Sequence, residues 1–149
     1  MDNKMFCFQC EQTAGCSGCT GCAGVCGKSA DVANLQDKLT GSLIGLAGVI
    51  KNNVPSAEEK KLIIEGLFTT ITNVNFNEST IKTMIDKIHS ISGGADYDMT
   101  NIWNADEDIR SLKSLILFGI RGMAAYAYHA MVLGYEDETV DAFFVEALN

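Results

Sequence analysis

The stretch CFQCEQTAGCSGCTGCAGVC, residues 7–26, contains all six cysteines of this 149-residue chain. Four glycines lie between the cysteines and a fifth follows the last cysteine: Gly15, Gly18, Gly21, Gly24 and Gly27. Because glycine has no side chain, it lets the backbone approach a bound group closely. The stretch therefore predicts a loop that wraps around something thiolates bind, and it leaves the core of the fold to the residues that follow.

Three kinds of thiol site compete for this stretch. A disulfide framework is disfavoured, because the start MDNKMFCFQC has no apolar segment of the length that a secretory signal requires. A structural zinc site uses Cys-x-x-Cys pairs, which occur here, but such sites usually place a longer stretch between the pairs and rarely leave two thiols over. An iron–sulfur cluster fits best, since four thiolates hold one cluster and glycines bring backbone N–H groups to its sulfides.

The spacing by itself suggests one set of four ligands. The C-x2-C-x2-C-x3-C run of bacterial ferredoxins is reproduced by Cys16, Cys19, Cys22 and Cys26. Gly27 stands where that motif has proline, so the match is incomplete.

The charge of the chain limits its partners. The 11 basic and 19 acidic residues give a net charge of −8, which disfavours binding to nucleic acid or to an anionic membrane surface. No apolar stretch approaches 18 residues without a charge or a turn, so no membrane-spanning segment is expected.

Thiols at this density persist as ligands only under reducing conditions, which indicates a cytoplasmic protein in an anaerobic or microaerobic setting.

The residues after Cys26 are predicted to be almost entirely helical, with a single proline and no sustained alternation of apolar and polar residues. Helix starts are indicated at Ser29 and at the Ser56–Glu59 capping box, and a helix end is indicated at Gly93-Gly94. Five helices are expected, at about 29–51, 56–72, 81–92, 106–133 and 138–148, with a polar connector over 93–104. The predicted fold is all-α, a helical bundle preceded by a Cys/Gly-rich loop.

Two features of these helices predict how they pack. Helix 106–133 is apolar on most sides, so we expect it to be central. Glycines near one face of the first helix predict a close approach by another helix or by the cysteine loop; they are Gly41, Gly45 and Gly48. The pair Gly119 and Gly122 lies in mid-helix and is interpreted as packing, not as a nucleotide-binding loop.

No nucleophile–base pair is indicated by the pattern of polar residues. Both histidines, His89 and His129, lie in helical patterns without metal-ligand companions, and histidine in such a place is usually a packed or surface residue. A group of methionines and tyrosines is interpreted as core or interface: Met123, Tyr126, Tyr128 and Met131.

Long segments of the chain resemble the hybrid cluster (prismane) proteins, also called hydroxylamine reductases. MFCFQCEQTAG and GVCGK, within residues 5–28, and the Leu-Gln-Asp of 35–37 are similar to the amino terminus of that family. TTITNVNF (69–76) and EDIRSLKSLILFGIRGMAAYAYHAMVLGYEDE (107–138) are similar to later segments of its first domain. The resemblance covers essentially the whole chain but only the family's amino-terminal domain, and it implies a helical domain with a simple iron–sulfur cluster near its surface.

The resemblance also implies which cysteines are ligands. One class of the family holds a [4Fe–4S] cubane with C-x2-C-x7–8-C-x5-C, and a second class has wider spacings and a [2Fe–2S] cluster. Four cysteines match in context, namely Cys7, Cys10, Cys19 and Cys26, although the last gap of six residues is one longer than in the first class. We expect these four to bind a [4Fe–4S] cluster. The alternatives are a [2Fe–2S] cluster, or an unusual cluster that uses Cys16 or Cys22, which are otherwise bystanders.

The function implied by the resemblance is redox chemistry. The family reduces hydroxylamine at a hybrid Fe–S–O cluster whose ligands come from later domains, and the matching segments do not occur in this sequence. We therefore expect an electron carrier, not catalytic by itself, that passes single electrons between a redox partner protein and an acceptor. The alternatives are a subunit or fragment of a hydroxylamine or NO reductase completed by another chain, and a thiol or Fe–S redox sensor.

One domain is expected over 1–149. Its parts are a cluster-binding loop (1–28), a first helical bundle (29–92) and a second helical part (104–149). One stripe of the last helix is apolar, with Val140, Phe143, Phe144, Ala147 and Leu148. Because exposing this stripe and helix 106–133 to water would be costly, we expect a homodimer that pairs the C-terminal helices of two copies.

Overall fold

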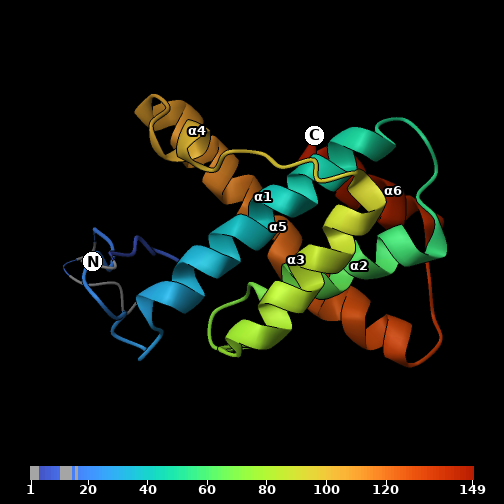
Figure 1. Ribbon diagram of the computed structural model, residues 1–149. Coiled ribbons are helices and arrows are strands. Elements are labelled where there is room, and N and C mark those ends of the chain that lie inside the picture. The colour runs from blue at the N-terminus through green and yellow to red at the C-terminus, as the bar shows by residue number, and fades with distance from the viewer. Residues whose placement is uncertain (1–3, 11–14, 16) are drawn as a thin grey trace.

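The computed structural model describes residues 4–10, 15 and 17–149. Over these residues, six helices follow the amino-terminal loop (Figure 1). They are α1 (Ala30–Ile50), α2 (Ala57–Thr69), α3 (Glu78–Ser92), α4 (Thr100–Trp103), α5 (Glu107–Val132) and α6 (Glu138–Leu148). The all-α prediction is confirmed. The main difference is α4, a short helix inside the stretch that was predicted to be a connector without helix.

The predicted capping residues fix the ends of the first three helices. The Ser29 hydroxyl accepts a hydrogen bond from Val32 N at 3.2 Å and begins α1. Ser56 and Glu59 form the complete capping box at the start of α2. Gly93 ends α3 in the left-handed conformation, with φ of 68°. Each cap satisfies backbone groups that the first or last turn of a helix leaves without a partner.

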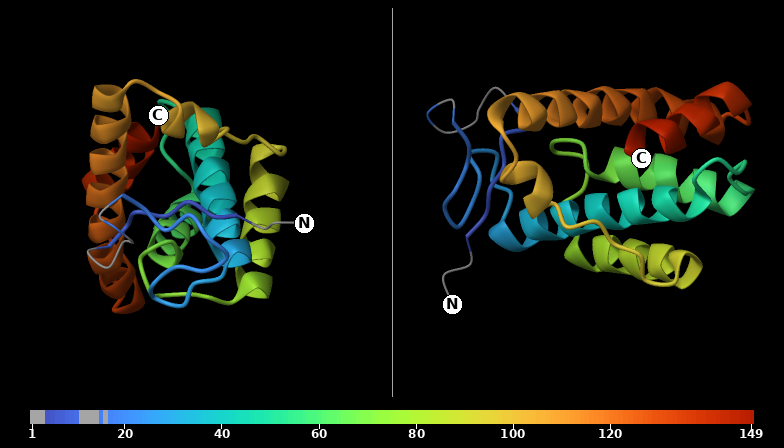
Figure 2. Two further views of the ribbon diagram at one scale, coloured as in Figure 1. Left: turned by 90° about the vertical axis from the view of Figure 1, so that its left-hand side faces the viewer. Right: turned by 90° about the horizontal axis from the view of Figure 1, so that it is seen from above.

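Helix α1 is the centre of the molecule. In both views of Figure 2 it lies between α5 on one side and α3 on the other. Its residues Leu39, Leu43 and Leu46 are fully buried. The core forms around them from side chains of α2, α3, α5 and α6.

Helix α5 lies at the side of the molecule, so the prediction that it is central is wrong. Its buried residues form one narrow stripe: Ser114, Leu117, Ile120, Arg121 and Ala124. Large apolar side chains on its other sides are exposed, namely Ile109, Leu112, Leu115, Ile116 and Phe118. The reason is that the described residues cover only the side of α5 that faces α2, α4 and α6. A helix that is apolar on most sides can therefore lie at the surface of this chain.

By length and composition, α5 is also long and apolar enough to cross a membrane, although no such segment was expected from the sequence. Only 22% of its most apolar 18-residue window is buried. Length and composition are weak indicators, because core helices of soluble proteins meet the same criteria.

Two of the three glycines of α1, Gly41 and Gly45, do mark a close approach, but neither a helix nor the cysteine loop makes it; at Gly48 a Cβ would meet only Asn149 Oδ1, at 3.9 Å. The connector between α3 and α4 crosses α1 here, and Tyr97 N donates a hydrogen bond of 3.0 Å to Gly41 O. A Cβ added at Gly41 or Gly45 would overlap the backbone carbonyl of Tyr97 or Ala95. By contrast, a Cβ at Gly119 or Gly122 would meet no described atom within 4 Å. The packing role predicted for this second pair is therefore wrong within the described residues.

Candidate functional site

Two of the four predicted ligands lie side by side in the amino-terminal loop. Cys7 N donates to Cys19 O at 3.0 Å, and Cys19 N donates to Cys7 O at 2.7 Å. A further backbone bond of 3.2 Å, from Met5 N to Gly21 O, extends this antiparallel pairing. The pairing brings together two cysteines that are twelve residues apart, which spacing alone did not predict.

A tight turn positions a third predicted ligand, Cys26. The turn is closed by two backbone bonds, from Gly24 N to Lys28 O at 2.8 Å and from Gly27 N to Gly24 O at 2.9 Å. Gly27 has φ of 85°, a conformation that residues with a side chain rarely adopt. A Cβ at Gly24 would lie 3.5 Å from Cys26 Sγ, an ordinary contact distance, so Gly24 and the sulfur are neighbours.

Aromatic side chains attach the loop to the helices. The rings of Phe6, Phe8 and Trp103 contact one another with centroids 5.3–5.8 Å apart, and Trp103 belongs to α4. Gly18 has φ of 139°, and a Cβ there would lie 2.7 Å from the Phe6 ring. Figure 2 shows that the loop lies across one end of the helical bundle. The short α4, which sequence analysis missed, therefore anchors the candidate site.

The predicted ligands differ in exposure. Cys7, Cys10 and Cys26 are half-buried, and Cys19 is buried. Cys22 is exposed, whereas Cys16 lies outside the described residues. No disulfide joins the described cysteines.

The donor set matches an iron–sulfur group in its chemistry, because it consists of thiols in one glycine-rich loop. The thiols that the structure describes are not arranged around one point. Within 4–10, 15 and 17–149, no three His, Cys, Asp or Glu side chains are grouped closely enough to hold a metal ion. Residues of this loop would hold the group, and binding would have to draw the sulfurs together.

Buried cations lie next to this loop. Lys28 is 1% exposed, and its Nζ donates to Gln36 Oε1 at 2.5 Å. Arg121 of α5 is 8% exposed and donates to two threonine hydroxyls, from Nε to Thr70 Oγ1 at 2.9 Å and from Nη2 to Thr40 Oγ1 at 3.1 Å. Sequence analysis did not select Arg121, although a charged residue inside the apolar run LILFGIRGMAAY is a signal that could have identified it.

The carboxyl of Asp37, a half-buried residue of α1, lies near these cations. Burial raises the pKa of Asp37 to about 6, and the positive charges of Arg121 and Lys28 only partly offset the effect. Asp37, Arg121 and Cys7 line the same small cavity, of about 20 Å³, behind the Phe6–Gln9 segment. The loop thus lies over two opposite charges, the half-buried Asp37 of α1 and the buried Arg121 of α5.

A serine, a histidine and an aspartate also meet, where the α3–α4 connector crosses α1. Ser42 Oγ lies 2.6 Å from Asp96 Oδ1 and 3.1 Å from His89 Nε2, and the same Nε2 lies 2.8 Å from Asp96 Oδ1. Burial would raise the pKa of Asp96, but hydrogen bonds from Ser42 and His89 outweigh it and lower the pKa. In a catalytic triad, the histidine contacts serine and aspartate through different ring nitrogens. Here one nitrogen faces both, so we interpret the cluster as holding the connector in place.

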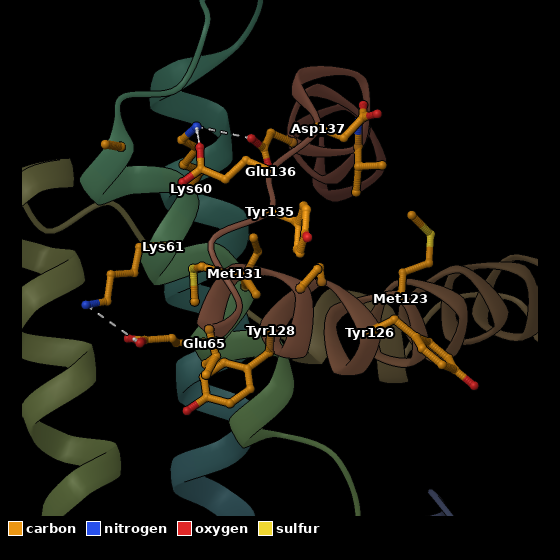
Figure 3. Close-up of a pocket in the computed structure, with 17 residues that line it drawn as sticks. Lys60, Lys61, Glu65, Met123, Tyr126, Tyr128, Met131, Tyr135, Glu136 and Asp137 are labelled. Carbon is orange, nitrogen blue, oxygen red and sulfur yellow. Dashed lines mark hydrogen bonds and ion pairs between the residues drawn. The ribbon is translucent and has the colours of Figure 1, made fainter.

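A cavity of about 750 Å³ lies between α2, α5 and α6 (Figure 3). At one end Lys60 donates to Glu136 at 2.5 Å and pairs with Asp141 at 3.3 Å. Elsewhere it is lined by the methionines and tyrosines predicted to be core or interface, of which Tyr126 is 83% exposed. No serine, cysteine or histidine is among its lining residues, and both of its lysines pair with carboxylates: Lys60 with Glu136 and Asp141, and Lys61 with Glu65. The cavity is therefore a weaker candidate for redox or hydrolytic chemistry than the cysteine loop.

Comparison with known proteins connects the chain to a redox family. The model of the Prismane/CO dehydrogenase family matches residues 5–149. The chain is similar to hydroxylamine reductases of Desulfitobacterium hafniense strain Y51 (37% identical over 188 residues) and Caldanaerobacter subterraneus subsp. tengcongensis (41% over 185 residues), each match covering 97% of the chain. The hydroxylamine reductase of Porphyromonas gingivalis strain ATCC 33277 is 37% identical over 185 residues and matches 100% of the chain.

The chain spans about a third of the length of these relatives, 33% in each case. The matched regions, 185 to 188 residues long, also exceed the 149 residues of the chain. The relatives therefore contain additional residues within the region of similarity as well as beyond it.

Proposed function

The chain belongs to the Prismane/CO dehydrogenase family, and from this premise we propose that its amino-terminal loop binds an iron–sulfur cluster that relays single electrons. The observation that carries the proposal is the donor set: thiols in one glycine-rich loop, two of them joined by the Cys7–Cys19 backbone pairing. Thiolates are the ligands that iron–sulfur clusters require.

We propose Cys7, Cys10, Cys19 and Cys26 as the ligands of a [4Fe–4S] cluster. When bound, such a cluster accepts and releases one electron at a time. The loop positions Cys7 beside Cys19 and holds Cys26 in a turn, while the aromatic contacts with α4 keep the loop on the bundle. The exposed Cys22 is proposed to be a bystander.

The proposed setting follows from the thiols. A cluster held by half-buried cysteines near the surface needs a reducing environment, which supports a cytoplasmic location and an anaerobic or microaerobic cell. We further propose a redox partner protein, because a surface cluster exchanges electrons only with a group that can approach it.

A second candidate function is catalytic. The relatives are named hydroxylamine reductases, and the match covers only 33% of their length. The chain would then be the amino-terminal part of such an enzyme, with its loop supplying electrons to chemistry performed elsewhere. A redox sensor, in which an oxidant modifies the exposed Cys22, is a third possibility.

The first experiment reconstitutes the chain with iron and sulfide without oxygen, then measures both contents and the EPR spectrum of the reduced protein. We expect a [4Fe–4S] signal that is lost or converted when Cys7, Cys10, Cys19 or Cys26 is changed to alanine. Cys16→Ala and Cys22→Ala are the matched controls and should retain it. Loss of iron in Cys22→Ala with retention in Cys19→Ala would contradict this ligand set.

The second experiment separates carrier from enzyme. Reconstituted chain is assayed for hydroxylamine reduction with reduced methyl viologen, and the carrier function predicts no turnover above the background of free iron and sulfide. Turnover that follows the protein peak through chromatography would favour the catalytic alternative.

A third experiment tests the redox sensor by mass spectrometry of Cys22 after peroxide treatment. The sensor hypothesis predicts that Cys22 is oxidised before the cluster is lost.

A further inference from the structure

Arg121 is a buried positive charge whose hydrogen-bond partners are neutral. Its guanidinium donates to the hydroxyls of Thr40 and Thr70, both fully buried. No carboxylate forms an ion pair with it among the residues that the structure describes. A buried charge without a counter-ion is costly, so a nearby negative charge would be stabilised strongly.

The two threonines fix the guanidinium in place without neutralising it. Thr40 donates its own hydroxyl hydrogen to Gln36 O at 2.9 Å, and Thr70 donates to Leu67 O at 2.8 Å. Their remaining lone pairs therefore point to Arg121. Thr70 also caps the carboxyl end of α2, where the helix dipole favours a cation.

The guanidinium lies next to a proposed ligand. Arg121 and Cys7 line the same cavity of about 20 Å³, together with Asp37. Burial lowers the pKa of Arg121, and negative charge at Asp37 and at Cys7 opposes that change, so the charges at these positions interact. Asp37 is the carboxylate that shares this cavity, and burial disfavours its negative charge. Arg121 would therefore stabilise additional negative charge at the other ionisable group of the cavity, Cys7.

We propose that Arg121 is the fixed positive charge that raises the reduction potential of the iron–sulfur group held by the cysteine loop, and that Asp37 opposes it. On reduction, the group gains one electron from a one-electron donor, which is oxidised, and no covalent bond changes. The added negative charge is stabilised by a nearby cation and destabilised by a nearby carboxylate, and net charge is one of the factors that set such potentials. This inference rests on the proposed function.

The test is an EPR-monitored redox titration of the reconstituted chain, in wild type and in Arg121→Gln, Arg121→Lys and Asp37→Asn. Arg121→Gln should shift the midpoint to more negative potential, enough to lower the ratio of reduced to oxidised cluster about tenfold at a fixed potential, which is about 59 mV for one electron. Arg121→Lys, which keeps the charge, should recover most of the shift. Asp37→Asn should move the midpoint in the opposite direction when measured above pH 7.

A matched control removes a positive charge far from the cavity. Lys61 lies at the amino end of α2, about nine residues or 14 Å along the axis from Thr70, and its side chain is 60% exposed. Lys61→Gln should leave the midpoint unchanged. An equal shift in Lys61→Gln and Arg121→Gln, or no shift in Arg121→Gln, would overturn the proposal.

Iron and sulfide contents separate this inference from the function on which it rests. If wild type binds no cluster, the proposed function fails. If wild type binds a cluster and Arg121→Gln does not fold, Asp37→Asn decides alone, because it leaves the arginine and its threonines intact. A positive shift in Asp37→Asn then supports the proposal, and an unchanged or more negative midpoint overturns it.

Discussion

Helices α1 and α5 are both long and rich in apolar residues, yet the structure uses them differently. α1 is buried over most of its surface, with Leu39, Leu43 and Leu46 inaccessible to solvent. α5 is buried along one stripe, and Leu115 on its outer side is 69% exposed. The comparison shows that an apolar surface determines that a helix needs cover, but not what covers it.

The glycines of the two helices show the same contrast. Gly41 and Gly45 of α1 lie under the α3–α4 connector, which approaches so closely that a methyl group would overlap its backbone. Gly119 and Gly122 of α5 face no described atom within 4 Å. A glycine in mid-helix thus permits close approach, but the approaching segment must be known before the position can be interpreted.

The largest expected effect compares one leucine from each helix. Leu43→Ala should lower the free energy of unfolding by about 3–5 kcal/mol, because it leaves a cavity in a fully buried site. Leu115→Ala should change it by no more than about 0.5 kcal/mol, since the side chain is already exposed. Urea unfolding followed by circular dichroism measures both. Similar losses in the two variants would mean that the outer side of α5 is covered in solution.

The next prediction compares one glycine from each helix. Gly45→Ala should destabilise the chain by about 3 kcal/mol, because the new methyl group displaces the backbone at Ala95. Gly122→Ala should stabilise it by about 1 kcal/mol, since alanine favours helix and the site is open. The same unfolding measurement applies. A loss at Gly122 comparable to that at Gly45 would show that another segment packs there.

A pH effect is expected where α1 meets α5. Because burial raises the pKa of Asp37 to about 6 in the folded chain, above its ordinary value of 3.8, its contribution to stability is fully present below about pH 4 and is lost as pH rises through 6. Asp37→Asn should therefore stabilise the chain at pH 7 by about 2 kcal/mol and have little effect at pH 4. Unfolding midpoints in urea from pH 4 to 7.5 test this, and an equal difference at all values would contradict it.

The smallest effect on stability is expected for a charged residue on the outer side of α5, Leu115→Glu. This change should instead alter the oligomeric state. The proposed homodimer predicts that the wild type scatters light at twice its 16.1 kDa mass and that Leu115→Glu is monomeric with unchanged helix content. Lys87→Gln, an equal change in charge on exposed α3, should remain dimeric. A soluble wild-type monomer at micromolar concentration would rule out the homodimer.

The last helix already argues for a smaller dimer surface than expected. Phe144, Val145 and Leu148 of α6 are buried within the chain, and Asn149 Nδ2 donates to Ala47 O at 3.2 Å. Of the five residues of the predicted apolar stripe, Phe144 and Leu148 are thus buried, Val140 and Ala147 are half-buried, and Phe143 is 44% exposed. Any pairing between copies would therefore rest mainly on α5.

What the sequence by itself determined is local. Capping residues at Ser29 and Ser56, and the glycine at 93, establish helix ends because each acts on backbone groups within a few residues. The cysteine and glycine pattern likewise indicates the kind of group bound, because ligand chemistry depends on residue type.

What only the tertiary structure decided is which distant residues meet. The pairing of Cys7 with Cys19, the placement of Arg121 behind the loop and the close contact of Ala95 with Gly45 each join separate parts of the chain. The same apolar pattern permitted α5 to be central or peripheral, since burial depends on the competition of all helices for cover. Local patterns specify what a segment can do, and the packing of the whole chain determines where it does it.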